Sequence, residues 1–165
     1  MNKLAKEFKA VSLDLKQTIH NFDDEQFNKV PGIGGWTAGQ AAEHIHKSMR
    51  GLPLLLMRNT VPSTREPEQH VKTLRDMFLD FEAKYEAAPA LQPSTDHHDK
   101  DDLEQKIVSI LDKLAEIAAT EDLTQLCTGF EFPTIGQLTR SEMLNFTSAH
   151  TQRHIHQMKK IKEVL

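Results

Sequence analysis

The chain has 165 residues, of which 38% are apolar and 27% charged, and its 20 Lys and Arg residues stand against 24 Asp and Glu residues for a net charge of −4. This length fits one domain, residues 1–165. The sequence contains no run of about 18 apolar residues, so no membrane-spanning helix is predicted. The acidic balance, with no dense basic block, argues against a nucleic-acid partner. The single cysteine, Cys127, excludes an intramolecular disulfide and a multi-cysteine zinc site. We therefore expect a soluble, cytoplasmic domain in which Cys127 is a small buried apolar residue.

Apolar residues at helical spacing predict two helices in the first third of the chain. The first covers about residues 2–20. The second is predicted to begin at Thr37, which forms a T-x-x-Q capping box with Gln40. It should continue to about Arg58, with a bend at Pro53.

A long connection and two further helices follow. Within residues 60–100 a short helix is predicted, with Pro67 in its first turn and with four apolar positions, namely Val71, Leu74, Phe78 and Phe81. A third long helix is expected over about 101–119. The fourth should begin at Thr139, in a capping box with Glu142, and should run to about residue 163.

These elements predict an all-α fold, a four-helix bundle. Antiparallel neighbours in a bundle need only short connections, whereas some forty residues separate the second and third helices. We expect this long link, with its short helix, to cross over along the bundle. No strand-like alternation of apolar and polar residues is evident, so no sheet is expected.

Nine histidines are an unusual number for this length, and three of them are predicted to face the core. At about 100° per residue, His150 and His154 lie on the apolar side of the last helix. Their Cβ atoms should be about 5–6 Å apart, so both rings can reach one metal ion. His44 lies on the corresponding side of the second helix.

The other histidines are predicted to lie away from this core. His46 should face solvent or a partner subunit, and His156 falls outside the apolar stripe of its helix. The adjacent pair His97 and His98 stands among aspartates and is predicted to be solvated loop. His20 and His70 are assigned to a helix end and to a helix.

Three inward histidines have two explanations. A single one is most often a buried residue with one satisfied hydrogen bond. Three buried imidazoles, however, each need a polar partner or lose about 1–3 kcal/mol on desolvation. One divalent cation satisfies all three, so the pattern favours a metal site between facing helices.

Two segments that contain these histidines resemble the DinB-like (DinB/YfiT-type) superfamily of metal-dependent four-helix bundles. The run GGWTAGQAAEHIHKS resembles that family's entry to its second helix, W-[S/T]-x-x-[E/Q]-x-x-x-H-[I/L], with Trp36 eight residues before His44. The run AHTQRHIHQMKKI is similar to its last-helix pattern H-x-x-x-H-x-x-Q, matched by His150, His154 and Gln157. The segments ALQPS and FPTIGQLTRSEM are similar to its crossover loop and to its approach to the last helix. Trp36 is expected to be a packing residue that closes the bundle end.

The resemblance implies an up-down-down-up topology and, frequently, a homodimer. It also implies that His44, His150 and His154 hold a divalent metal. Gln157, one turn beyond His154, could orient a ligand or a bound water, or it could be a glutamine at the rim of the core. Imidazole ligands suit Zn or Ni, which are our first expectations, and also Fe or Mn.

Three neutral imidazoles leave a coordination position open, as in catalytic zinc sites. A water there would be acidified toward neutrality, and a thiol could bind as thiolate. Enzymes of the family are similar in using such a metal for thiol-linked chemistry. We therefore expect a metal-dependent hydrolase or thiol S-transferase that acts on a small molecule. No general base is assigned, because Glu142 belongs to a helix cap and Glu43 points off the ligand face.

Two other functions remain open from the sequence. One is a non-catalytic metal-binding or stress-response dimeric bundle, in which the metal only connects the second and fourth helices. The other is a purely structural dimerisation bundle whose buried histidines hold no metal. Both would share the helical fold, so they differ from an enzyme in the chemistry at the histidines.

Overall fold

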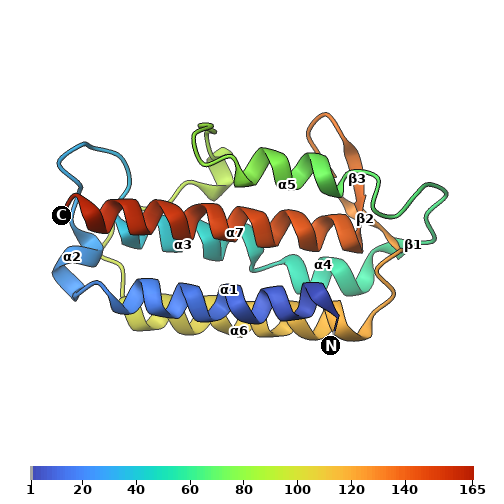
Figure 1. Ribbon diagram of the computed structural model, residues 1–165, viewed down its shortest axis with the longest axis horizontal. Coiled ribbons are helices and arrows are strands. Elements are labelled where there is room, and N and C mark those ends of the chain that lie inside the picture. The colour runs from blue at the N-terminus through green and yellow to red at the C-terminus, as the bar shows by residue number, and fades with distance from the viewer. Residues whose placement is uncertain (1) are drawn as a thin grey trace.

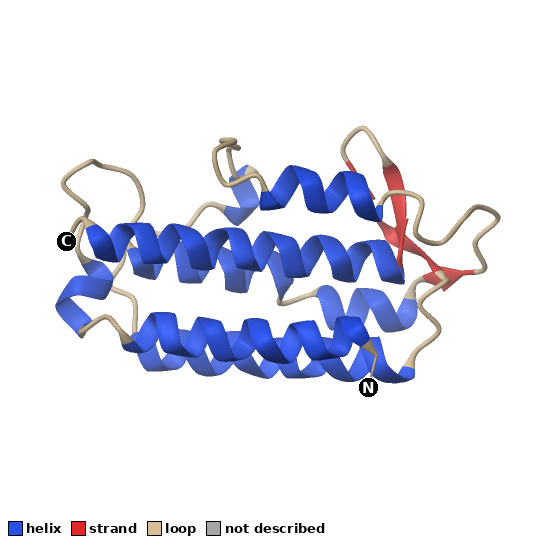
Figure 2. Cartoon of the chain, in the orientation of Figure 1, coloured by secondary structure: helices blue, strands red, loops and turns tan. Residues whose placement is uncertain are grey.

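Four long stretches of helix lie side by side in the computed structural model, which describes residues 2–165 (Figure 1, Figure 2). Three of the predicted helices are confirmed to within a residue or two at each end, as α1 (Lys3–His20), α6 (Lys100–Thr120) and α7 (Arg140–Glu163). α1 packs along α6, and α7 contacts α1, α3 (Ala38–Met49) and α5 (Val71–Leu79). A short helix, α2 (Asp24–Asn28), lies between α1 and α3.

The second predicted helix is two helices rather than one bent helix. α3 ends at Met49, and α4 (Leu52–Arg58) begins after Gly51. Pro53 has no N–H to donate to the carbonyl of Met49, and its ring crowds that carbonyl. The helix therefore stops one turn upstream of the proline, and Pro53 sits in the first turn of α4, where a missing N–H does no harm.

The crossover contains a shorter helix than predicted. α5 covers Val71–Leu79, so Pro67 lies in the turn before it and Phe81 lies beyond its end. The backbone N–H of His70, at the N-cap of α5, donates to the carboxylate of Glu142 at 2.9 Å. The first turn of α5 is therefore stabilised by the distant Glu142, and Pro67 is not part of that turn. A 3₁₀ turn, η1 (Pro89–Leu91), lies later in the crossover.

The fold is mostly helical as predicted, but a small antiparallel sheet at one end of the bundle contradicts the expectation that the chain forms no sheet (Figure 2). Its strands, in the order in which they pair, are β1 (Thr60–Val61), β2 (Leu126–Phe132) and β3 (Gly136–Thr139). An irregularity between Leu126 and Glu131 breaks the pairing of β2 with β3. In β2 only Cys127 and Phe132 are buried, and they are five residues apart. This irregularity thus removes the alternation of buried and exposed residues by which a strand is recognised in a sequence.

The space between the helices is filled by apolar side chains. Among the largest that are fully buried are Phe8, Leu15, Ile19, Ile45, Leu111 and Leu114. Cys127 is buried in the same core, as predicted, and desolvation raises the pKa of its thiol to about 11. No helix in the described part of the chain is long and apolar enough to cross a membrane.

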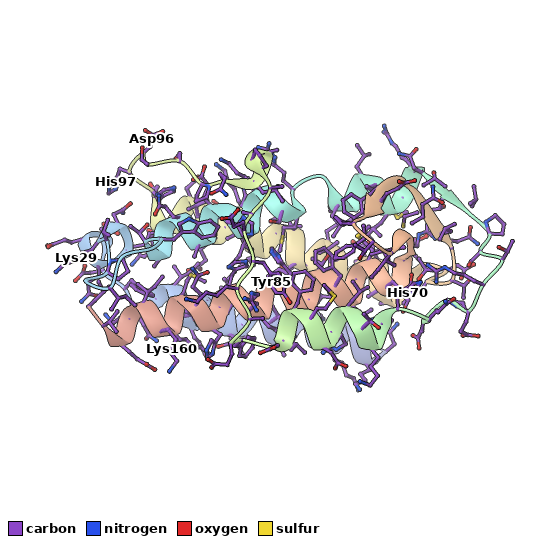
Figure 3. All side chains as sticks on the ribbon, turned by 90° about the horizontal axis from the view of Figure 1, so that it is seen from above. Lys29, His70, Tyr85, Asp96, His97 and Lys160 are labelled. Atoms are coloured by element: carbon purple, nitrogen blue, oxygen red, sulfur yellow. The ribbon has the colours of Figure 1, made fainter. Side chains whose placement is uncertain are left out.

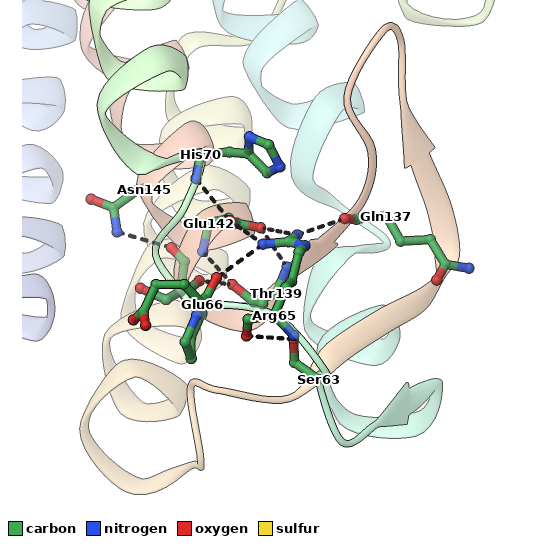
Figure 4. A network of polar contacts seen from close by, with 10 residues as sticks. Ser63, Arg65, Glu66, His70, Gln137, Thr139, Glu142 and Asn145 are labelled. Atoms are coloured by element: carbon green, nitrogen blue, oxygen red, sulfur yellow. Dashed lines mark hydrogen bonds and ion pairs between the residues drawn. The ribbon is translucent and has the colours of Figure 1, made fainter.

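A buried ion pair connects the sheet end of the molecule to the start of α7 (Figure 4). Glu142 is fully buried and accepts hydrogen bonds of 2.7 Å from both terminal nitrogens of Arg65. Its carboxylate also accepts from the backbone N–H groups of Thr139 and His70 at 2.9 Å. Burial by itself raises the pKa of Glu142, but the hydrogen bonds from Arg65, Thr139 and His70 outweigh it and hold the pKa below its ordinary value of 4.5. The predicted capping box is confirmed, and its glutamate also caps α5.

We expect Arg65→Ala to lower the free energy of unfolding by about 2–3 kcal/mol, because the buried Glu142 carboxylate would keep only its amide donors. Arg65→Lys should recover part of this loss, since an ammonium cannot make the bidentate contact. Urea unfolding followed by circular dichroism measures both. As a control, Lys72→Ala removes an exposed ion pair with Asp76 and should cost less than about 1 kcal/mol. Equal losses in Arg65→Ala and Lys72→Ala would contradict the importance of the buried pair.

Candidate metal centre

Three histidines from two helices converge on one point between α3 and α7. The Nε2 atom of His150 lies 3.1 Å from that of His44 and 3.2 Å from that of His154. One nitrogen from each of the three rings can be chosen so that all lie within 4.8 Å of one another. His44 and His154 are buried and His150 is partly exposed. The structure thus brings together the three residues selected from the sequence, because α3 packs on α7 and one helical turn separates His150 from His154.

Hydrogen bonds on the far side of two rings determine which nitrogen faces the centre. The Nδ1 atom of His44 lies 2.8 Å from the carbonyl oxygen of Leu91, which can only accept, so Nδ1 carries the proton. The Nδ1 atom of His154 lies 2.7 Å from Oε1 of Gln157, an amide oxygen that also only accepts, so this Nδ1 carries the proton as well. In both rings Nε2 is left with its lone pair toward the centre. Ligating imidazoles in metal sites are held by outer partners in this way.

The donor set fits a divalent metal ion. With the lone pairs of His44 and His154 both directed inward, the Nε2 atom of His150 can donate a proton to only one of them. The hydroxyl of Ser48 lies 3.5 Å from Nε2 of His44 but donates to the His44 carbonyl at 2.7 Å. Protein groups therefore leave at least one inward nitrogen without a donor, whereas one cation accepts all three lone pairs.

Burial keeps these imidazoles neutral. It lowers the pKa of His44 below the ordinary 6.5. It lowers the pKa of His154 to about 4, helped by the nearby His44. The pKa of His150 lies well below 6.5, first because of desolvation and then because of repulsion from His154 and His44. At neutral pH all three rings are in the form that binds a metal.

Aromatic rings surround the three histidines. The ring of Trp36 lies 5.1 Å from that of His44 and is stacked 6.1 Å from that of His154. On the other side, Phe78 and Phe146 lie 5.8 Å and 5.6 Å from the ring of His150. Trp36 packs at the start of α3 as predicted, but its contact with two of the three histidines was not foreseen. Trp36 lies before the N-cap of α3, outside the helix, so helical periodicity does not predict this contact.

The prediction for the adjacent pair His97 and His98 is half wrong. His97 is exposed, and Figure 3 shows it projecting from the rim of the molecule beside Asp96. His98 instead is buried, with Nε2 2.7 Å from a carboxylate oxygen of Glu43. Space for it exists because Gly39 has no side chain: a Cβ there would lie 2.8 Å from the Cβ of His98. Contacts distant in sequence, rather than the surrounding aspartates, decide its burial.

Neither nearby glutamate joins the cluster. Within the described residues, only His44, His150 and His154 form a group able to hold a metal ion. Burial by itself raises the pKa of Glu43, but the hydrogen bonds from His98, Ser94 and Lys47 outweigh this effect and lower the pKa to about 2. Glu142 is held by Arg65, as described above. Both carboxylates therefore have other partners, in agreement with the sequence analysis.

Two further histidines lie near the cluster in sequence without joining it. His46 and His156 are partly exposed, and each is two residues from a histidine of the cluster. The ring of His156 stacks on Phe81 at a distance of 4.3 Å.

Two comparisons with known proteins found a match. The family model described as the DinB superfamily matches residues 7–158, a range that contains all three clustered histidines. Among curated proteins, the chain is 24% identical over 160 residues to "Uncharacterized protein YuaE" of Bacillus subtilis (strain 168), a match that covers 94% of this chain and 95% of that protein. No solved structure matches the chain.

In the metal-free protein we expect the His154 ring to stay neutral until the pH falls to about 4, which NMR titration of its ring protons can measure. The unfolded chain, with a pKa near 6.5, then binds more protons than the folded chain. The stability associated with the neutral ring is therefore complete above pH 6.5 and declines as the pH falls toward 4. His154→Gln should flatten this part of the stability curve. Protonation of His154 near pH 6.5 in the folded protein would contradict the predicted shift.

Proposed function

The chain belongs to the DinB superfamily, and on that premise we propose that it is a metal-dependent enzyme in which His44, His150 and His154 hold one divalent ion. One observation carries the proposal: three Nε2 atoms meet at a single point while the Nδ1 atoms of His44 and His154 are already hydrogen-bonded outward. Three imidazole ligands leave a coordination position for a substrate. Zn or Ni fits this ligand set best, with Fe or Mn as alternatives.

We infer a hydrolase or a thiol S-transferase acting on a small molecule. A divalent ion in this site would supply a Lewis acid that lowers the pKa of a water or a low-molecular-weight thiol. The protein's own residues keep the imidazoles neutral and orient them through the Leu91 carbonyl and Gln157. The rings of Trp36, Phe78 and Phe146 pack against those of His44 and His150.

Thiol transfer is the better supported of the two reactions. Hydrolytic zinc sites commonly pair the metal with a glutamate general base, as in the H-E-x-x-H motif. Among the described residues no carboxylate joins the three histidines. A thiol, with an ordinary pKa near 8.5, needs less help to lose its proton than a water does. This favours a low-molecular-weight thiol as the nucleophile.

We also propose that the bundle has the up-down-down-up topology of the family. In Figure 1, α1 and α7 run in one direction, whereas α3 and α6 run in the other. The long connection between α4 and α6 is then the crossover between two parallel helices. This order leaves α3 and α7 antiparallel neighbours, which is what brings His44 opposite His150 and His154.

Elemental analysis of the untagged protein tests the metal site. We expect about one equivalent of Zn or Ni per chain after loading and dialysis. His44→Ala and His150→Ala should each reduce the content to less than about a tenth, because two imidazoles bind a divalent ion far more weakly than three. His46→Ala and His156→Ala are matched controls and should keep the wild-type content. No metal in the wild type after exposure to Zn, Ni, Fe and Mn would overturn the proposal.

A non-catalytic metal-binding bundle is the second candidate, and the location of the histidines on two helices favours it. An ion that joins α3 to α7 would stabilise the fold by about 4 kcal/mol at a concentration a thousand times its Kd. Titration of the cobalt-loaded protein with small thiols distinguishes the candidates. A change in the visible spectrum supports an open catalytic position. A stabilised protein whose spectrum does not respond would support the non-catalytic function.

We propose that the chain forms a homodimer through α4. Leu54 and Met57 are 55% and 44% exposed and lie three residues apart on that helix. Light scattering after size exclusion should give twice the mass of the chain. Leu54→Lys should shift the protein toward the monomer, because the charge would be buried in a symmetric contact. Leu13→Lys, on α1 and 58% exposed, is the matched control and should leave the mass unchanged. A monomeric wild type would contradict the proposal.

A further inference from the structure

A strip of three polar side chains on α3 binds the backbone of the crossover. The strip consists of Gln40, Glu43 and Lys47, which share one face of the helix. Gln40 donates to the carbonyl of Ser94 at 3.0 Å, and Glu43 accepts from the N–H of Ser94 at 2.7 Å. Lys47 donates to the carbonyl of Gln92 at 2.8 Å. The strip thus holds the segment 91–98, which has almost no regular structure of its own.

Glu43 is the centre of this strip. Besides Ser94, its carboxylate is bonded to Nε2 of His98 at 2.7 Å and forms an ion pair of 3.1 Å with Lys47. The backbone of His98 exchanges two hydrogen bonds with the side chain of Asn28, of 2.7 Å and 3.0 Å. Its ring lies against Gly39, where a Cβ would leave it no room. One carboxylate therefore fastens the segment at both Ser94 and His98.

The same segment begins with the residue that orients His44. Leu91 ends the turn η1, and its carbonyl accepts from Nδ1 of His44 at 2.8 Å. Ser94, three residues later, is bonded to the strip on both its N–H and its carbonyl. Consecutive residues on a helix point about 100° apart, so Glu43 can face the segment while His44 faces the centre. The Leu91 carbonyl and the partners of the strip thus lie within one short segment that is bonded to α3.

We propose that Glu43 is a positioning residue, which holds segment 91–98 on α3 so that the Leu91 carbonyl fixes the tautomer and the orientation of His44. With that carbonyl displaced, the proton of His44 can move to Nε2, and a ring protonated there cannot bind a metal through that atom. The metal part of this inference rests on the proposed function.

The tautomer of His44 can be measured without any metal. In ¹⁵N–¹H correlation spectra of the chelator-treated wild type, His44 should appear as the tautomer protonated on Nδ1. In Glu43→Ala we expect a mixture of the two tautomers. His154 is an internal control, because Gln157 holds its Nδ1 and the segment does not contact that bond. Its signals should stay unchanged. An unchanged His44 in Glu43→Ala would overturn the inference.

Zinc affinity, measured by competition with a chelator, supplies the second readout. Loss of an outer partner of a ligating histidine typically weakens metal binding 10–100-fold, so we expect about 10-fold for Glu43→Ala, which acts one contact further away. The zinc affinity of Glu43→Gln should lie between those of the wild type and Glu43→Ala, because its amide oxygen can still accept from Ser94. Gly39→Ala, a change that favours the helix in itself, should weaken binding as well by displacing His98.

Glu7→Ala separates positioning from general stability. The side chain of Glu7 is 20% exposed and that of Glu43 17%, and Glu7 also binds three donors, namely Arg75, Ser148 and Gln152. None of these three donors orients a histidine of the cluster. Glu7→Ala should therefore lower stability while zinc affinity stays within about twofold of the wild type. If Glu7→Ala and Glu43→Ala lose affinity equally, the role of Glu43 is merely structural and the inference fails.

The inference and the proposed function can fail separately. Zinc binding by the wild type, combined with equal affinity and an unchanged tautomer in Glu43→Ala, would overturn the inference and leave the function standing. A wild type that binds no divalent metal would overturn the function and, with it, the metal role of Glu43. The expected result is a change of tautomer in Glu43→Ala together with weaker zinc binding.

Discussion

The packing of α3 against α7 is the constraint on which the site depends, because it forces three imidazoles into one buried volume. Imidazole is a base with an ordinary pKa near 6.5, and burial lowers that pKa because it disfavours the charged form. A neutral ring still has one donor and one acceptor nitrogen that need partners. Here the donors of His44 and His154 are directed outward to Leu91 and Gln157, so the acceptors meet inside. The orientation of a candidate metal site thus follows from how the helices satisfy buried polar groups.

Two polar clusters hold the helices that carry these rings, and both depend on a glutamate that binds backbone amides. At the sheet end, Glu142 joins Arg65 to the first turn of α7. Along the crossover, Glu43 joins segment 91–98 to α3. Neither carboxylate was assigned as a general base from the sequence, and the structure gives both of them hydrogen-bond partners. Each stabilises an element that bears histidines of the cluster.

Local signals in the sequence were sufficient for most of the helices and for the pair His150 and His154, whereas His44 joins that pair through the packing of α3 on α7. The periodicity of α1 and α6 and the capping boxes at Thr37 and Thr139 depend on residues within a turn or two of one another. The pair His150 and His154 is equally local. At Pro53 only a bend was predicted, whereas the helix ends at Met49 and a new one begins after Gly51, because a proline can either kink a helix or end it. The strand β2 and the burial of His98 depend on partners far away in the chain, which no local pattern contains.

The double use of Glu142 has a consequence for the order in which the chain folds during synthesis. α5 has nine residues, too few to be stable as an isolated helix, and the N–H at its N-cap is bonded to a side chain 72 residues later. The ribosome must therefore finish most of the chain before α5 can acquire this cap. Until then α1, α3 and α6 can associate while the crossover stays unattached. α7 follows these helices in the chain, and its Glu142, His150 and His154 thus complete α5, the sheet end and the histidine cluster only after the other helices have been made.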